Sequence, residues 1–468
     1  MMRRPATPRG WMVLLFAMLL LLPGAAHAHI ELDESSPAAD EVLSTLPSHL
    51  RLLFSARIEG RYTSVTLTAP DGRPVTLGDV VFMSGSDREI TLRLPSLTQA
   101  GTYVVRWRTA GADGHVLQGS YSFVLAPDSA ATPDTAAQRG AVPGVTAPPA
   151  TVSGGDDPHG HHTDAEPVGV VRGAIGRGLH FGALLLLLGA VTFRVVLLPR
   201  LQLTAVTASA LQRRIWSVIA GAAVFLAFAA VLRLWSQSIS LHGSERAWNT
   251  ELLSIMLTDT SWGRAWLLQA VLFALLGMAI VWARPGRDRA ASVVAVIAVL
   301  GLAAIPALSG HAAAATGIGR LIIVNDALHV AGAGAWLGML AVLMFAGLPA
   351  ILRLEADGTG AAARAIDTFS PLALAGGAIV MLSGGINALA HFSTLSQLWT
   401  TGYGRVLLLK LLFVAGVGAA GFVNWRMVRP RLRAAGGLRR LRLAAGAELL
   451  FALLVLTATA VLTGQQRP

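Results

Sequence analysis

The chain has 468 residues, of which 54% are hydrophobic and only 13% are charged, and it contains no cysteine. This balance is typical of an integral membrane protein, and the lack of cysteine excludes disulfides and thiolate metal sites. The formal net charge of +11 would suit nucleic-acid binding, but most arginines stand in short segments between apolar runs, where they set membrane orientation. We therefore do not expect nucleic-acid binding, and because no GxxxxGK[ST] loop occurs, we do not expect ATP-driven activity.

Residues 1–28 have the pattern of a secretory signal peptide. Three arginines precede an apolar run over residues 11–22, and Ala26-His27-Ala28 has the small-x-small form of a cleavage site. The run is shorter than the roughly 20 residues that a spanning helix needs, although an uncleaved anchor is the alternative. Cleavage after Ala28 would make His29 the first residue of the mature chain, with a free α-amine.

Residues 29–126 predict a small all-β sandwich or barrel. Short alternating runs occur at residues 64–67, 89–94 and 102–107, and turn signals such as Pro70-Asp71-Gly72 separate runs of this kind. Several short strands in roughly 100 residues are typical of a small antiparallel β-domain. We expect this to be the one soluble domain.

Residues 127–167 predict a flexible linker. They are rich in Pro, Ala, Gly, Thr and Asp and hold almost no large apolar side chain, so they cannot bury enough surface to fold. Near their end, His159, His161 and His162 follow two aspartates. This cluster could bind a metal or could be a solvated patch of the linker.

Residues 168–468 predict an all-α bundle of eight membrane-spanning helices. The links after the first, third, fifth and seventh stretches are rich in arginine, so the positive-inside rule places them in the cytoplasm and both ends of the mature chain outside. The apolar stretches long enough to span are about 170–198, 215–236, 264–283, 291–309, 321–348, 371–391, 405–425 and 443–463.

Two segments of the β-domain could form a copper site. An N-terminal His29 can chelate a divalent metal through its α-amine and ring nitrogen, and Cu(II) favours such nitrogen-rich tetragonal settings. In Asp113-Gly114-His115, the glycine would let the carboxylate and the imidazole turn toward one point. Alone, such a triplet is more often an ordinary turn.

These segments resemble CopC, a family of periplasmic copper-binding proteins. The resemblance is carried by His29-Ile30, Ser35-Ser36-Pro37-Ala38 and Asp113-Gly114-His115 followed by Gly119–Phe123, and it covers nearly the whole β-domain. It implies that His29, Asp113 and His115 bind Cu(II). Relatives with a separate Cu(I) site carry a methionine-rich loop, which this domain lacks, so we expect a Cu(II) site alone.

Ionisable residues in the membrane helices are candidates for a copper pathway, because they are costly in a bilayer and usually face the bundle interior. Asp326 and His329 lie at i and i+3 of the fifth helix and share one face. They could bind an ion together or form a structural hydrogen-bonded pair. His180, His311 and His391 stand toward the outer ends of other helices, where they could converge on this pair or reach the aqueous interface.

Three further residues complete the candidate pathway. Met339 lies ten residues after His329 on a broadly similar face, and its thioether suits Cu(I), although methionine is also a common packing residue. Lys410 in the seventh helix and Glu448 near the inner end of the eighth could balance charge or relay protons. Snorkelling or structural pairing is the alternative for both.

The membrane region resembles CopD, the inner-membrane partner of CopC, in its eight-helix pattern and in several motifs. The resemblance implies copper movement across a bacterial inner membrane, usually regarded as import, with the CopC-like domain in the periplasm as donor. The motifs are Ser309-Gly310-His311-Ala312, Asp326-Ala327-Leu328-His329 with Trp336-Leu337-Gly338, Ser383-Gly384 with Asn387, Tyr403-Gly404 with Lys410, and Asn424.

We therefore expect a copper transporter rather than an enzyme, with copper ions, the lipid bilayer and periplasmic copper chaperones as partners. Two alternatives stay open. Histidines on neighbouring helices could ligate haem or copper in a membrane redox protein. The β-domain could also serve a copper sensor or buffer that transports nothing.

Overall fold

The computed structural model describes residues 32–55, 57–97, 99–111, 116–126, 167–284, 286–309, 319–389, 394, 396–434 and 436–464. Contacts divide the chain into two compact units, whose described residues fall within 32–126 and 167–464.

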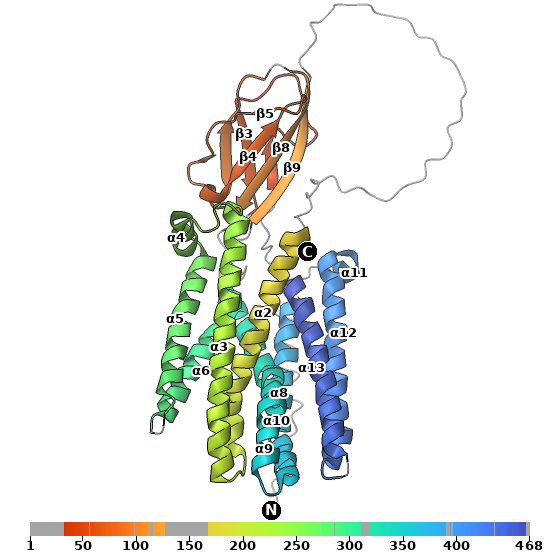
Figure 1. The fold of residues 1–468 in the computed structure, drawn as a ribbon. Helices are drawn as coiled ribbons and strands as arrows, with labels where there is room; N and C mark the ends of the chain where they lie inside the picture. The colour runs from red at the N-terminus through yellow and green to blue at the C-terminus, as the bar shows by residue number, and fades with distance from the viewer. Residues whose placement is uncertain are drawn as a thin grey trace, which may run out of the picture. The chain divides into compact units, whose positions relative to one another are not determined.

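Nine strands and one short 3-10 helix make up the N-terminal unit in the part of the chain that the structure describes (Figure 1). One sheet has the strand order β1-β3-β7-β6, and the other has the order β2-β9-β8-β4-β5. All neighbours are antiparallel except β2 and β9. The elements are β1 (Leu32–Ser36), β2 (Val42–Leu43), β3 (His49–Phe54), η1 (Gly60–Tyr62), β4 (Ser64–Thr68), β5 (Pro74–Val75), β6 (Val81–Phe82), β7 (Glu89–Arg93), β8 (Gly101–Ala110) and β9 (Val116–Leu125).

Apolar side chains from both sheets fill the space between them. Leu50, Leu52 and Phe54 alternate along β3 and are fully buried, as expected for a strand with one face on a core. The Phe54 ring meets the Trp107 ring of the other sheet edge to face, with centroids 5.2 Å apart. The predicted all-β sandwich is confirmed.

Two glycines of this unit are required by the backbone or by a close approach. Gly72 ends the turn between β4 and β5 with φ +82°, a conformation that disfavours side chains. Gly119 of β9 lies opposite Trp107 of β8, and a Cβ there would overlap the indole ring. The predicted turn signal at Pro70-Asp71-Gly72 therefore marks a real chain reversal.

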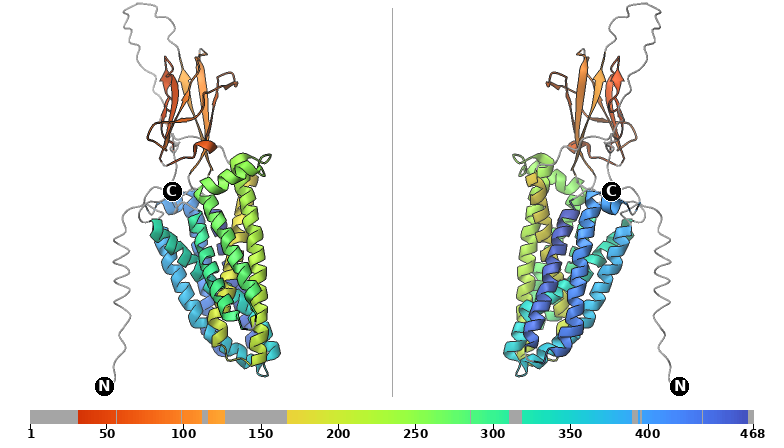
Figure 2. Two further views of the ribbon diagram at one scale, coloured as in Figure 1. Left: turned by 90° about the vertical axis from the view of Figure 1, so that its left-hand side faces the viewer. Right: turned by 90° about the vertical axis from the view of Figure 1, so that its right-hand side faces the viewer.

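The C-terminal unit contains eight helical spans that are long and apolar enough to cross a membrane, counted over the described residues (Figures 1 and 2). The predicted eight-helix bundle is confirmed. The elements are α2 (Pro167–Thr192), η2 (Phe193–Leu197), η3 (Leu198–Arg200), α3 (Ala205–His242), α4 (Thr250–Asp259), α5 (Ser261–Trp282), α6 (Asp288–Leu308), α7 (Gly319–Ala333), η5 (Gly334–Gly338), α8 (Met339–Val342), η6 (Leu343–Gly347), α9 (Leu348–Leu354), α10 (Gly358–Leu389), α11 (Gln397–Thr400), α12 (Gly402–Val423), η7 (Asn424–Val428), η8 (Arg429–Arg431) and α13 (Gly437–Leu462).

Several helices extend beyond the apolar stretches that predicted them. α3 begins at Ala205, ten residues before the predicted start, because Thr204 caps it and the Glu355 carboxylate accepts a 2.9 Å hydrogen bond from the Thr204 N–H. The short helix α4 is not predicted by hydropathy. Asn249 begins it by accepting hydrogen bonds from the N–H groups of Glu251 and Leu252 at 3.0 and 3.1 Å.

Short π-helical segments interrupt three of the spans in the described part of the unit. They are η2, η5 with η6, and η7, and each widens a helical turn by one residue. The segment η5 follows α7 directly and carries Trp336. Residues after it are therefore rotated relative to a regular helix continued from α7.

Helix α2 packs against several other spans, including α3, α6, α8 and α13. It approaches η5 closely, since a Cβ on Gly189 or Gly338 would overlap the backbone of the facing helix. Small residues also join α7 to α10, where Gly332 faces the carbonyl oxygen of Gly376. These close approaches let short polar side chains reach across the α7–α10 interface.

Candidate functional site

Asp326 and His329 lie in the middle of α7, in the fifth membrane span. They are three positions apart in the helix, so they share one helix face, as the sequence predicts. That face meets α10 near the end of α10, where Ser383 and Asn387 stand one turn apart. A polar cluster therefore joins two membrane helices.

Hydrogen bonds connect the members of this cluster across the helix interface. Asn387 Nδ2 donates to Asp326 Oδ1 at 2.5 Å, and Asn325 Nδ2 donates to Asn387 Oδ1 at 2.6 Å. Asn325 also donates to the Ser383 carbonyl oxygen at 3.0 Å. The two asparagines thus hold the Asp326 carboxylate in one position, and neither is among the predicted site residues.

The hydrogen bonds of Ser383 determine which nitrogen of His329 carries a proton. Ser383 Oγ lies 2.5 Å from the Ile379 carbonyl oxygen. Because a carbonyl oxygen can only accept, the Ser383 hydroxyl donates its proton to it. His329 Nδ1 lies 3.0 Å from the same Oγ and must donate to it. The neutral imidazole then keeps its lone pair on Nε2, the arrangement that a metal-binding histidine needs.

Lys410 and Gly384 complete the surroundings of His329. Lys410, on α12, is within electrostatic reach of both Asp326 and His329. Gly384 faces the imidazole, and a Cβ at this position would stand 3.1 Å from His329 Cε1. The cluster therefore combines one carboxylate, one imidazole and one ammonium group, with room made by a glycine.

His180 has a different environment from this cluster. It is 2% exposed on α2, and its Nε2 lies 3.5 Å from Nη1 of Arg233 on α3. Arg177, one turn earlier, donates to the Ala460 carbonyl oxygen at 2.9 Å. Because a guanidinium faces His180, its position disfavours a second cation there.

Met339 and Glu448 also lie apart from Asp326 and His329. Met339 is fully buried in the apolar core of the membrane unit. Glu448 is 3% exposed, and its Oε1 accepts a 3.0 Å hydrogen bond from Trp336 Nε1. The predicted position of Glu448 near the inner helix end is wrong, because α13 begins at Gly437 and places it about 16 Å inside the helix.

Five predicted ligands lie outside the described residues, and their roles stay predictions. They are His29, Asp113, His115, His311 and His391. In the sequence, Asp113 and His115 stand between β8 and β9, the two longest strands of the sandwich. Within the described ranges no group of three or more His, Cys, Asp or Glu side chains is gathered for metal binding.

Comparisons with known protein families agree with this architecture. Residues 32–126 match the CopC domain, residues 173–321 match the copper resistance protein D-like N-terminal domain, and residues 363–462 match copper resistance protein D. Together the three matches cover the β-domain and most of the membrane unit, apart from residues 322–362.

Similar proteins include two whose names refer to copper and one solved structure of CopC. Copper transport protein CutJ of Bacillus subtilis is 25% identical over 428 residues, covering 90% of this chain and 72% of the relative. Copper resistance protein C of Pseudomonas syringae pv. tomato is 31% identical over 116 residues, 24% of this chain and 91% of the relative. The crystal structure of CopC from Methylosinus trichosporium OB3b shares 30% identity, covers 22% of this chain and all of that one, and has a TM-score of 0.21.

The fold and the family matches together define a multi-pass membrane protein of the copper transport and resistance class. The chain belongs to the CopC family over its N-terminal domain and joins that domain to the copper resistance protein D domains in one polypeptide, as a CopC–CopD fusion homologous to CutJ.

Proposed function

We propose that this protein imports copper across a bacterial inner membrane. Its CopC domain, on the periplasmic side, binds Cu(II) through His29, Asp113 and His115 and passes copper to a membrane site formed around Asp326 and His329. The support for the first step is the family match together with the CopC-like residues at these three positions. Fusion makes the transfer intramolecular, so the donor stays at a high effective concentration.

One observation carries the membrane step: the hydrogen bond of His329 Nδ1 with Ser383 leaves Nε2 as the lone-pair nitrogen. On the same helix face, the Asp326 carboxylate is fixed by Asn387. An imidazole and a carboxylate at i and i+3 offer nitrogen and oxygen ligands to one ion. Both have hydrogen-bonded partners that set their orientation, as ligands of metal sites do.

Lys410 gives this site a way to stay electrically balanced. Without copper, its ammonium compensates the Asp326 carboxylate, which is costly to leave alone in a membrane. An arriving copper ion would take over that compensation, and the ammonium would then move or lose its proton. We leave His180 and Met339 out of the proposed ligand set, because Arg233 faces the first and the apolar core surrounds the second.

Copper accumulation in cells that lack other copper importers tests the proposal. His329→Ala should lower accumulation at least about tenfold, since even the partners that orient metal ligands contribute 10–100-fold. His29→Ala should lower it at limiting copper concentrations only. His49→Ala, at the exposed start of β3 in the same β-domain, is the matched control and should have no effect.

Three outcomes would overturn the proposal. If neither His329→Ala nor His29→Ala changed accumulation while both proteins reached wild-type levels in the membrane, the chain would not transport copper through these residues. A haem Soret band from the purified protein would instead favour the redox alternative. Copper binding by the β-domain without flux into vesicles would favour a sensor or buffer.

A further inference from the structure

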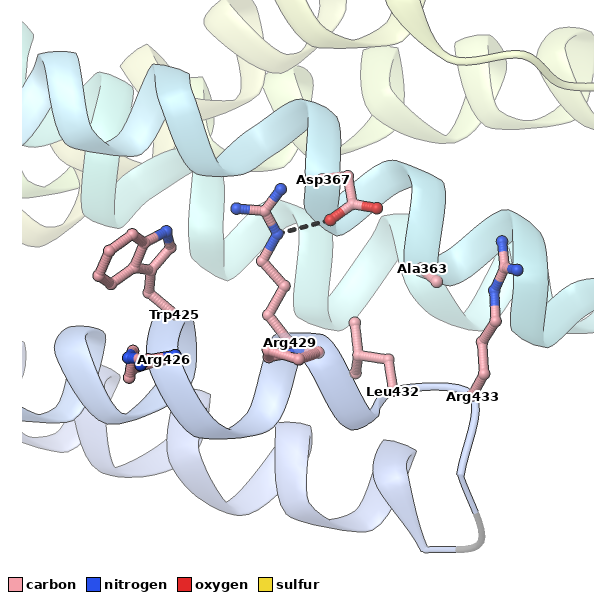
Figure 3. Close-up of a pocket in the computed structure, with 8 residues that line it drawn as sticks. Ala363, Asp367, Trp425, Arg426, Arg429, Leu432 and Arg433 are labelled. Carbon is pink, nitrogen blue, oxygen red and sulfur yellow. Dashed lines mark hydrogen bonds and ion pairs between the residues drawn. The ribbon is translucent and has the colours of Figure 1, made fainter.

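A pocket of about 460 Å³ lies between α10 and the end of the span formed by α12, η7 and η8 (Figure 3). Asp367 of α10 and the three arginines Arg426, Arg429 and Arg433 are among the residues that line it. Arg426 and Arg429 lie in the last turns of the seventh span, and Arg433 lies in the arginine-rich link that follows it. The pocket is far from Asp326 and His329 along both α10 and α12, at the opposite ends of these helices.

The charges in the pocket do not balance. Arg429 Nε forms a 2.5 Å ion pair with Asp367 Oδ1, so the single carboxylate is already used. Arg426 and Arg433 are both exposed and have no ion pair with a carboxylate in the described part of the chain. Three guanidinium groups and one carboxylate leave a net charge of +2, which an anion would neutralise.

Apolar side chains continue from the pocket along the outer face of the same span. Phe422, Trp425 and Met427 are each more than half exposed, with 59%, 55% and 54% of their surface accessible. Trp425 also lines the pocket. Tryptophan beside arginine is typical of the level where lipid headgroups meet acyl chains, and guanidinium groups bind phosphate oxygens in pairs.

We propose that this pocket binds the phosphate group of an anionic phospholipid, with the acyl chains lying along Phe422 and Met427. The phosphate is held by Arg426 and Arg433, while Arg429 stays paired with Asp367. A lipid in this position ties α10 to the end of α12. Those two spans bury little of their surface otherwise, so a bound headgroup adds contacts where the protein supplies few.

Native mass spectrometry of the full-length protein with phosphatidylglycerol or phosphatidylcholine tests this site. The wild type should retain phosphatidylglycerol preferentially, and Arg426→Gln/Arg433→Gln should weaken that retention about tenfold or more, because each arginine near a headgroup contributes measurably to binding. Arg426→Lys/Arg433→Lys should recover part of it, since lysine keeps the charge but not the paired hydrogen bonds.

Arg284→Gln/Arg287→Gln is the matched control, because it removes two exposed arginines from another link at the same end of the bundle. Equal loss in both double variants would show general charge attraction and overturn the pocket. Retention that is the same for both lipids would also overturn it. Binding of labelled inorganic phosphate that depends on Arg426 and Arg433, without retention of phosphatidylglycerol, would overturn the lipid as the source of the phosphate.

Discussion

The two sides of the membrane unit are built by different interactions. In the most apolar 18 residues of the span that contains α2, 61% lie buried inside the protein, against 11% for the spans that contain α10 and α12. The α2 side is joined mainly by close glycine and leucine contacts, with Arg177 and His180 adding two polar contacts, whereas the α7–α10 interface adds asparagine, serine, histidine and aspartate to its glycine contact.

This difference indicates that the α2 side is a rigid scaffold and that the α7–α10 interface can rearrange. Close apolar packing holds helices in a single arrangement, because any displacement loses many small contacts at once. A polar interface can exchange its hydrogen bonds for bonds to an ion or to water. In the proposed mechanism, the copper step therefore lies at the α7–α10–α12 side, and α2 with its neighbours is the fixed part.

The largest effect should follow from breaking the scaffold at Gly338. A Cβ there would overlap the Leu185 carbonyl oxygen, so Gly338→Ala forces two helix backbones apart. We expect a loss of about 3 kcal/mol or a failure to fold, measured as thermal unfolding and monodispersity in detergent. Gly182→Ala on α2 is the control, because a Cβ there meets nothing within 4 Å. Wild-type stability of Gly338→Ala would contradict the close packing.

A smaller effect is expected at Glu448, where a buried carboxylate meets the scaffold. Glu448→Leu leaves the Trp336 indole N–H without its acceptor, which should lower the free energy of unfolding by about 2 kcal/mol. Glu448→Gln keeps an acceptor oxygen and should unfold nearly as the wild type does. Copper transport by Glu448→Gln then separates the two predicted roles of Glu448, which are proton relay and structural pairing.

If Glu448 relays protons, Glu448→Gln should abolish the pH dependence of transport in vesicles while leaving stability intact. If the residue only holds Trp336 in place, Glu448→Gln should transport as the wild type does at every pH. Either result decides between the relay and the structural pair, because Glu448→Gln removes the proton site and keeps the hydrogen bond, whereas Glu448→Leu removes both.

Both units could be predicted as classes from the sequence, because hydrophobic periodicity reports local structure directly. The alternation Leu50, Leu52, Phe54 predicts a half-buried strand, and β3 is one. The extension of α3 to Ala205 could not be predicted, because its cap depends on Glu355, which is remote in sequence. Hydropathy detects apolar length and says nothing of such contacts.

The candidate site could be predicted only in part, because the sequence reports contacts within one helix and not contacts between helices. Asp326 and His329 form an i, i+3 pair that one helix alone determines. Their partners Ser383 and Asn387 come from another helix, and no spacing in a single sequence shows which helices meet. Met339 was predicted on a face similar to that of His329 by counting regular turns, but the π-helical η5 lies between them and Met339 packs in the core.

A smaller and more local effect is expected from Gly384→Ala at the polar α7–α10 interface. Gly384→Ala would place a Cβ 3.1 Å from His329 Cε1 and push the imidazole out of line with Ser383. We expect a loss of only about 1 kcal/mol in stability, since the ring can shift by a few tenths of an ångström. The KM for copper uptake should rise several-fold, because ligand orientation is disturbed.

Gly385→Ala is the matched control for this variant, because a Cβ at Gly385 has open space around it. Both substitutions change helix propensity in α10 alike, so their difference isolates the contact with His329. Equal uptake kinetics for the two variants would mean that the His329 position does not matter for copper. A raised KM in Gly384→Ala alone would tie the site to the imidazole.

The smallest effect is expected at Glu355, between the fifth and sixth spans. Hydrogen bonds from Thr207 and Thr204 hold the pKa of this exposed carboxyl below its usual 4.5. A carboxyl with a lowered folded-state pKa stabilises the protein above about pH 4.5, and that contribution is lost as the pH falls through the folded-state value. Thermal unfolding should therefore be measured between pH 7 and pH 3. The wild type should have a higher Tm than Glu355→Gln at neutral pH, and the difference in Tm should shrink in acid.

A double-mutant cycle tests the cause of this pH dependence. Thr207→Val removes the hydroxyl that lowers the Glu355 pKa most, so the pH-dependent difference in stability that Glu355→Gln causes should be smaller when Thr207→Val is also present. An unchanged difference would mean that Thr207 does not act on the carboxylate. If the difference in stability grew in acid, the shift of the Glu355 pKa would have the opposite sign, because only a carboxyl with a raised folded-state pKa behaves in that way. That result would contradict the hydrogen bonds from Thr204 and Thr207.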